Sequence, residues 1–245
     1  MPTPLSEIWV YLAAQPLLGL TLTLVAYQVA QAIHRRARYS PLANPVAIAV
    51  AMLVTLLTLT HTSYRTYFEG AQFVHFMLGP ATVALAMPLY DQRRTLQRLL
   101  WPLLVALGVG VATALVSVVV IARLLGASRE TILSLAPKSV TAPVAMGISE
   151  KIGGYPSLTA VVVVLTGIFG AIVAKPVLDA LRLRDVVARG FAIGVAAHGI
   201  GTARAFQVSE EMGAFAGLAM GLSALLTALV APALVPPLVG WMGVR

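Results

Sequence analysis

The sequence has no cysteine and very few charged residues. Charged side chains make up 11% of its 245 residues and hydrophobic ones 59%, whereas a soluble domain has roughly 25% charged residues. Without cysteine, disulfide bonds, thiol nucleophiles and cysteine metal sites are excluded. The histidines (His34, His61, His75 and His198) have no metal-ligand spacing. The composition therefore excludes an ordinary soluble domain and predicts no metal site.

Enzyme motifs are also missing. The chain has no HExxH, no GxSxG, no Walker lysine loop and no pair of aspartates inside an apolar segment. Its net charge is +8, but the lysines and arginines lie in short loops between apolar segments, where they orient a protein in the bilayer. We therefore expect no enzyme activity, no cofactor and no nucleic-acid partner.

Long apolar runs are what the sequence does contain. Several segments of more than ~18 residues carry no formal charge, which is typical of transmembrane helices. These segments are residues 8–33, 39–64, 70–90, 99–122, 152–174 and 212–244. They predict an all-α, polytopic protein that crosses a lipid bilayer several times.

Three further features shape the expected topology. Residues 61–70 are polar and predict a connection between spans. Residues 176–190 place charges opposite apolar side chains and predict a helix that lies on the membrane surface. The last apolar run contains Pro232, Pro236 and Pro237, which predict breaks in its helix.

One apolar stretch, residues 135–154, is interrupted by two prolines, Pro137 and Pro143, so a single straight helix is disfavoured. Between these prolines lie Lys138, Ser139 and Thr141. A lysine beside two hydroxyls is costly inside a membrane and serves no purpose in a plain anchor. This pattern therefore predicts a functional site.

A second interrupted segment, residues 196–206, places His198 and Arg204 among glycines. Lys138 and Arg204 are the only formal charges inside apolar segments, and both are positive, so an anion would satisfy them. Hydroxyls and backbone N–H groups freed at the glycines would add donors for a carboxylate. The predicted substrate-binding residues are Lys138, Ser139, Thr141, His198, Gly199, Gly201, Thr202 and Arg204.

Structural explanations stand beside these roles. Lys138 could extend to the membrane interface or pair with Glu150, the nearest acid. Arg204 could anchor the outer end of its helix, and His198 could be either a proton carrier for coupling or a packing residue. The spacing of the glycines in the last two segments favours close helix packing. Those glycines are Gly190, Gly194, Gly213, Gly217 and Gly221.

Whether residues 132–149 cross the membrane decides the topology. If the stretch returns as a re-entrant hairpin, more basic residues share the side of the loops at Arg35 and Arg94, as the positive-inside rule prefers. The residues that change side are Lys175, Arg182, Arg184 and Arg189. We expect about seven spans plus this hairpin in one domain, residues 1–245. Its halves, 1–125 and 131–245, would form a possible inverted repeat with interrupted helices.

Three motifs resemble the LrgB/CidB family of membrane proteins. They are LGPATVALAMPLYDQ at residues 78–92, LAPKSVTAPVAMGISEKIGGYPSLTAVVVVLTGIFGA at 135–171, and AAHGIGTARAF at 196–206. The resemblance covers nearly the whole chain and extends to the chloroplast glycolate/glycerate translocator, in which an LrgA-like domain precedes this one. It implies a separate small LrgA/CidA-like membrane partner, leaves a homodimer open, and implies the bacterial plasma membrane as the location.

The family implies two functions. One is secondary transport of small monocarboxylates such as glycolate, glycerate or pyruvate. The alternative is a holin-like or antiholin-like regulator of murein hydrolase export and cell lysis. Cations buried in broken segments are what a carboxylate carrier needs, whereas a pore needs an amphipathic or oligomerising helix. The residues therefore favour transport.

Overall fold

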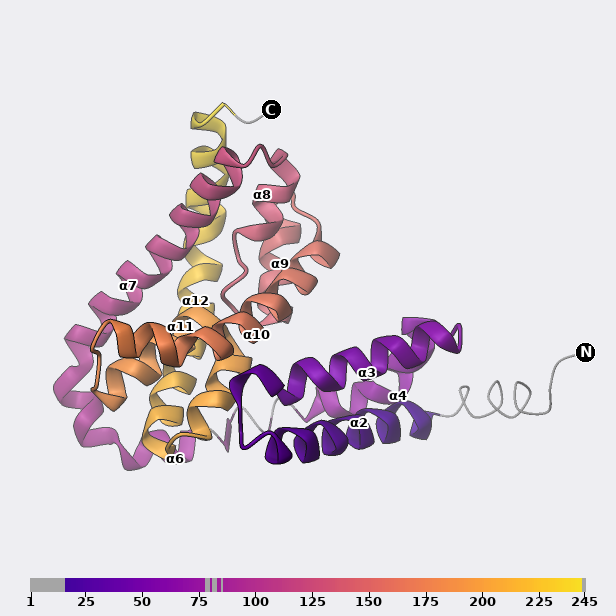
Figure 1. Ribbon diagram of the computed structural model, residues 1–245. Coiled ribbons are helices and arrows are strands. Elements are labelled where there is room, and N and C mark those ends of the chain that lie inside the picture. The colour runs from indigo at the N-terminus through magenta and orange to yellow at the C-terminus, as the bar shows by residue number, and fades with distance from the viewer. Residues whose placement is uncertain (1–15, 78–79, 81–82, 85, 244–245) are drawn as a thin grey trace, which may run out of the picture. The chain divides into compact units, whose positions relative to one another are not determined.

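The computed structural model describes residues 16–77, 80, 83–84 and 86–243, and helices are their only regular secondary structure (Figure 1). This confirms the predicted all-α class. The chain divides into two compact units, Met1–Ala84 and Leu85–Arg245. The units divide the chain earlier than the predicted halves, which meet near residue 125. The single LrgB-like domain and the inverted repeat stay predictions.

The first unit contains α2 (Pro16–Arg36), η1 (Pro41–Ala43), α3 (Pro45–Leu59) and α4 (Tyr64–Phe76). Asn44 starts α3, because its Oδ1 accepts hydrogen bonds from the backbone N of Val46 and Ala47 at 2.9 and 3.1 Å. The hydroxyls of Thr23 and Tyr67 lie 2.7 Å apart and join α2 to α4. These contacts make the three helices one packed unit.

The polar connection predicted at residues 61–70 is wrong, because α4 begins at Tyr64. Its first turn is stabilised locally, since the Ser63 hydroxyl accepts a hydrogen bond from the backbone N of Thr66 at 3.1 Å. The span predicted at residues 70–90 falls partly on residues 78–79, 81–82 and 85, which lie outside the described residues.

The second unit holds the candidate site. It contains α6 (Ala86–Asp91), α7 (Arg93–Leu124), α8 (Arg129–Leu135), α9 (Ala142–Ile152), α10 (Pro156–Ala180), α11 (Val186–Phe206) and α12 (Glu210–Trp241). The long helices α7 and α12 run side by side (Figure 1). Their carboxyl ends meet where Nε of Arg123 donates to the backbone O of Met242 at 3.3 Å.

A buried apolar core joins α7, α8 and α12. Its fully enclosed side chains include Leu115 and Val119 of α7, Ile132 of α8 and Val235 of α12, each at most 1% exposed. Side chains that are packed this closely hold the helices in a fixed arrangement. The core therefore fixes α8 against the two long helices.

Helices α8 and α9 form a hairpin, and its re-entrant course in the membrane stays a prediction. The backbone N of Tyr155, at the start of α10, donates to Oγ of Ser134 on α8 at 2.7 Å. The Thr159 hydroxyl lies 2.9 Å from the Ser134 carbonyl and 2.7 Å from Oγ of Ser149 on α9. All three hydroxyl residues are fully buried. The chain therefore returns to α8 after α9 instead of continuing away from it.

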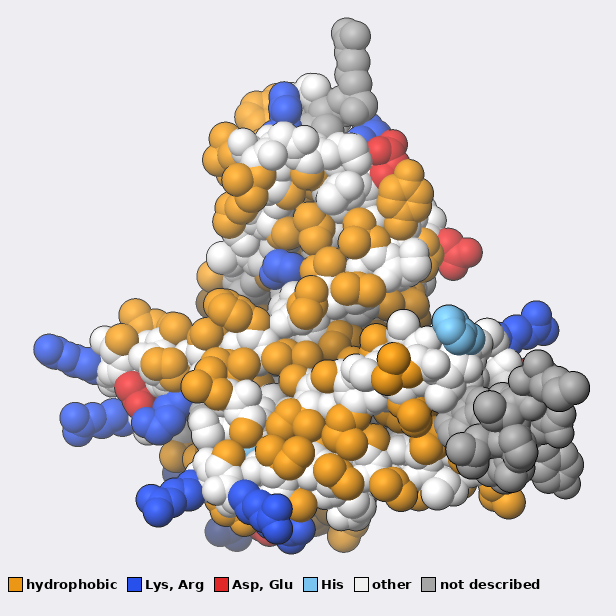
Figure 2. Space-filling view, turned by 45° about the vertical axis from the view of Figure 1, so that its right-hand side comes forward, with side chains coloured by type: hydrophobic (Ala, Val, Ile, Leu, Met, Phe, Trp, Pro, Cys, Tyr) orange, Lys and Arg blue, Asp and Glu red, His pale blue; other side chains and the backbone are white. Residues whose placement is uncertain are grey.

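Five helices are long and apolar enough to cross a membrane among the residues that the structure describes. They are Leu17–Arg36, Arg93–Leu124, Pro156–Ala180, Val186–Phe206 and Glu210–Trp241, and Pro45–Leu59 is a shorter apolar helix. Hydrophobic side chains cover most of the surface seen in Figure 2. The protein is a polytopic helical membrane protein, and the predicted number of about seven spans stays a prediction.

Two predictions about where helices begin and end are wrong. Helix α10 continues through Pro176 to Ala180, and α11 begins at Val186, so residues 176–190 do not form a separate surface helix. Ion pairs from Asp179 to Lys175 and Arg189, at 2.6 and 2.7 Å, hold this junction.

Helix α12 is likewise continuous through the three prolines where breaks were predicted. Each proline removes one backbone donor and strains the turn before it. The neighbouring face packs tightly, because Ala231, Val235 and Val239 are fully buried. Burial of this face keeps α12 continuous through its prolines.

Glycines let α11 and α12 approach each other closely. A Cβ on Gly190 would overlap the backbone carbonyl of Met212, and one on Gly194 would overlap that of Ala216. The packing interpretation is therefore confirmed for this pair. It is wrong for Gly221, where a Cβ would have nothing within 4 Å among the described residues.

We predict that Gly194→Leu prevents the close contact of α11 and α12. Overpacking typically costs about 1–3 kcal/mol, and here the obstacle is backbone that cannot rotate away. The folded fraction, measured by size-exclusion chromatography and thermal unfolding in detergent, should fall sharply. Gly221→Leu is the matched control on α12 and should fold normally. Equal behaviour of the two variants would contradict the packing.

The hairpin makes a topological prediction. Single cysteines replacing Ser128 and Tyr155 flank the hairpin at exposed positions, and both should react with a membrane-impermeant maleimide from the same side. Cysteines replacing Arg35, Arg94 and Arg184 should react from the opposite, cytoplasmic side. The natural absence of cysteine provides the unlabelled background. Labelling of Ser128→Cys and Tyr155→Cys from opposite sides would mean that the stretch crosses the membrane.

Candidate binding cavity

A cavity of about 630 Å³ lies within the second unit. Its walls come from α7, from the first half of α11 and from the break between α8 and α9. The lining residues that matter below are Leu99, Gly110 and Thr113 of α7, Lys138 and Ser139 of the break, and Asp185 and Val195 of α11. Most of the wall is apolar, so the few polar groups decide what the cavity can bind.

The break between α8 and α9 follows from the prolines. Pro143 has no backbone N–H to continue a helix from α8, and Thr141 before α9 is extended (φ −59°, ψ 143°). The intervening backbone is satisfied by tight turns, in which the N of Lys138 donates to the O of Leu135 at 3.1 Å. The predicted interruption of this segment is confirmed.

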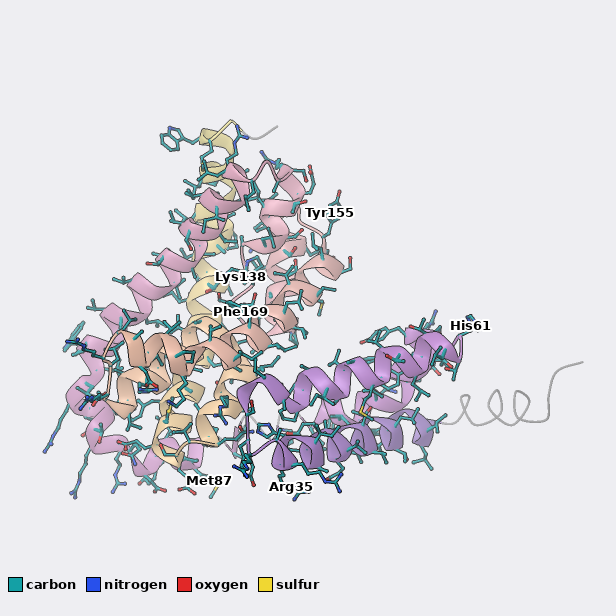
Figure 3. All side chains as sticks on the ribbon, viewed as in Figure 1. Arg35, His61, Met87, Lys138, Tyr155 and Phe169 are labelled. Atoms are coloured by element: carbon teal, nitrogen blue, oxygen red, sulfur yellow. The ribbon has the colours of Figure 1, made fainter. Side chains whose placement is uncertain are left out.

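The break places Lys138 in the middle of the second unit (Figure 3). Its Nζ donates to Oγ of Ser139 at 3.3 Å, and Ser139 is only 8% exposed. No carboxylate forms an ion pair with Lys138 in the described part of the chain. Glu150, the predicted partner, is exposed on α9. The cavity therefore presents a cation whose charge no neighbouring acid balances.

The other end of the cavity carries Asp185. This residue caps α11, because its Oδ1 accepts a hydrogen bond from the backbone N of Ala188 at 2.8 Å, and it is exposed. From Asp185 to Val195 the cavity follows α11 for about 15 Å at 1.5 Å per residue. Arg182 and Arg184 lie just before Asp185. The exposed end therefore lies beside one of the basic loops.

Sequence reasoning missed Asp185, Thr113 and Gly110 as cavity residues. The predicted site contained only residues inside the two broken segments. Gly110 and Thr113 lie on α7, and Asp185 lies just before α11. Gly110 had one usable signal, because a small residue on an apolar helix permits close approach. A Cβ on Gly110 would lie 3.1 Å from Cγ1 of Val195, across the α7–α11 contact.

The second broken segment is interrupted as predicted. Inside α11, Ala197 (φ −129°, ψ 17°) and His198 (φ 40°, ψ −137°) leave helical geometry. Positive φ is strained for a side chain other than glycine. The break turns the His198 ring toward α10, where Nε2 lies 2.9 Å from the backbone O of Val163.

The remaining predicted residues of this segment also face α10, α12 or the surface. The Thr202 hydroxyl donates to the O of His198 at 2.8 Å and lies 3.8 Å from the sulfur of Met220. Gly201 is tightly packed and Gly199 has more room. Arg204 is partly exposed and donates to Oε1 of Gln207 at 2.9 Å.

The structure thus brings together only part of the predicted site. Lys138 and Ser139 line the cavity, whereas the lining does not include Thr141, His198, Gly199, Gly201, Thr202 or Arg204. Helix α11 contributes Val195 and Ala196, the two residues immediately before its break. We therefore leave Arg204 out of the candidate cavity.

Residues 23–236 match the profile of the LrgB-like family. The chain belongs to this family. The holin-like protein CidB of Staphylococcus epidermidis is 31% identical to it over 221 residues, which are 90% of this chain and 96% of that protein. The uncharacterised protein YwbG of Bacillus subtilis is 37% identical over 216 residues, or 88% and 96% of the two chains.

The antiholin-like protein LrgB of Bacillus cereus is 28% identical over 221 residues, with 90% of this chain and 96% of that protein covered. No solved structure gives a significant match. The matched range of the LrgB-like family includes the whole second broken segment and the hairpin. The elements that build the cavity therefore belong to the part that defines the family.

Proposed function

We propose that the protein is a carrier of small monocarboxylates of the glycolate, glycerate or pyruvate type in the bacterial plasma membrane. The observation that supports this is the half-buried Lys138, which lines a largely apolar cavity and has no ion-pair partner in the described part of the chain. An ammonium that is partly withdrawn from water loses solvation, and an anionic ligand would supply a partner for it. The hydrogen-bonded hydroxyl of Ser139 offers a second contact to a carboxylate or an α-hydroxyl.

The size and position of the cavity fit this role. Its volume of about 630 Å³ leaves ample space for a molecule of a few heavy atoms and its water. The exposed end, at Asp185, follows directly on Arg182 and Arg184. Their positive charge offsets the aspartate and attracts anions to the entrance.

The names of relatives favour a second candidate. CidB is called holin-like and LrgB antiholin-like, so regulation of murein hydrolase export and cell lysis is the alternative function. Such a protein would act through association of helices, with a small LrgA/CidA-like partner or a second copy of itself. Exposed apolar residues of α7, among them Trp101, Val105 and Val109, offer surface for lipid or for such contacts.

We predict that Lys138→Met weakens carboxylate binding about 10- to 150-fold. A charge-assisted hydrogen bond is worth roughly 1.5–3 kcal/mol, and about 1.4 kcal/mol corresponds to a factor of ten. Methionine keeps the length and apolar character of the side chain, so folding should survive. The measurement is the concentration dependence of labelled glycolate, glycerate and pyruvate uptake by proteoliposomes.

Lys151→Met is the matched control, because Lys151 is exposed on α9 of the same hairpin. It should leave uptake unchanged. Unaltered saturable uptake in Lys138→Met would remove the proposed binding site. Two results together would establish the second candidate. The wild-type protein would transport none of the three acids, and Gly221→Leu would abolish regulation of lysis in cells.

A further inference from the structure

A second, much smaller cavity adjoins the inner end of the large one. Its volume is about 10 Å³, and it is enclosed by α7, α11, α12 and the α8–α9 break. Both cavities are lined by Ala114, Ser139 and Val195. The two spaces are therefore neighbours, and Ser139 lines both.

Three buried hydroxyls line the small cavity. They belong to Ser139 of the break and to Ser223 and Thr227 of α12, which are 8%, 1% and 4% exposed. Ser223 and Thr227 are four residues apart and so share one face of α12. Hydroxyls from two separate elements thus meet beside Lys138.

Two of these hydroxyls have hydrogen bonds within the protein. Oγ of Ser223 donates to the backbone O of Met220 at 3.1 Å, and Oγ of Ser139 accepts from Lys138. Thr227 has no hydrogen-bond partner among the residues that the structure describes. Its hydroxyl can therefore hydrogen-bond a molecule in the small cavity, which an apolar residue of the same shape could not do.

An apolar layer closes the path beyond Thr227. One turn further along α12 lies Ala231, followed by Val235, and both are fully buried. They belong to the same core as Val119 of α7 and Ile132 of α8. A dehydrated layer of this kind excludes water and ions as long as its helices stay in contact.

We propose that Ser139, Ser223 and Thr227 form the constriction of a transport pathway that is open at the Asp185 end and closed by the apolar layer beyond Thr227. The proposal rests on the proposed carrier function. The volume of the small cavity is close to the minimum for one water molecule, so a carboxylate passes only when the constriction widens. Because Ser139 lies in the hairpin and the other two hydroxyls lie on α12, widening separates the hairpin from α12.

The chain lacks cysteine, so single cysteines test the constriction directly. Ser223→Cys and Thr227→Cys are placed in purified protein in liposomes, and Ala231→Cys, one turn beyond Thr227, is the matched control. Silver ion, a water-sized probe that binds thiolates, is added on the side that carries the basic loops. We expect Ser223→Cys and Thr227→Cys to lose all later labelling by maleimide in denaturant, and Ala231→Cys to keep it. Saturating pyruvate or glycolate should slow the reaction with silver and therefore the loss of maleimide labelling.

This readout does not depend on transport, so the two proposals fail separately. Protection of Ser223→Cys and Thr227→Cys from silver, in protein that transports carboxylates, would overturn the constriction. So would equal reaction of Ala231→Cys, since that result places no closed layer beyond Thr227. Reaction of both pathway cysteines in protein that transports no carboxylate would show that silver reaches the constriction but would refute the carrier and, with it, a carboxylate pathway.

The isosteric variant Thr227→Val provides a second measurement. It removes the hydroxyl without changing the shape of the side chain, so folding should be unaffected. It should slow the reaction of Ser223→Cys with silver, because the cavity wall loses a hydroxyl that can hydrogen-bond water. Faster or unchanged reaction in the double variant would contradict a polar constriction.

Discussion

The proposed function of the second unit depends on one constraint: a half-buried ammonium group lines a largely apolar cavity, and no acid among the described residues forms an ion pair with it. Lys138 has only the hydroxyl of Ser139 as a hydrogen-bond partner in the described part of the chain. Such a charge would normally be paired, neutralised or drawn to the surface. Here the break between α8 and α9 places it, half-buried, in the wall of the cavity. A small anion that enters the cavity relieves this imbalance, which gives binding energy without a large interface.

The rest of the fold serves to keep that group in place. Buried hydroxyls of Ser134, Ser149 and Thr159 tie the two ends of the hairpin together. The glycines at positions 190 and 194 allow α11 and α12 to form a tight pair beside the cavity. The strained backbone of His198 ends the first half of α11 just after the cavity wall. A carrier needs parts that can move against each other. The tight α11–α12 pair and the α8–α9 hairpin could be such parts.

Much of this could be predicted from the sequence, and the failures have physical causes. Pro137 and Pro143 determine the first break, because proline removes donors that a helix requires. Composition alone indicated a helical membrane protein. The amphipathic pattern misled at residues 176–190, where α10 continues to Ala180, and proline misled in α12, where side-chain burial outweighed local preference. Arg204 and His198 were expected beside Lys138, yet they face other partners. Which way a side chain points after a break depends on the backbone angles at one or two residues, and no spacing rule encodes those angles.

Accelerated exchange tests the central claim most directly. Proteoliposomes loaded with unlabelled pyruvate or glycolate, and matched empty ones, are diluted into the labelled acid, and the initial rate of label entry is compared. A carrier that binds one carboxylate at a time in an enclosed cavity predicts faster, saturable entry into loaded vesicles, and loss of that difference in Lys138→Met. Entry that is equal in both vesicles, does not saturate and extends to unrelated solutes would contradict the account and indicate a pore.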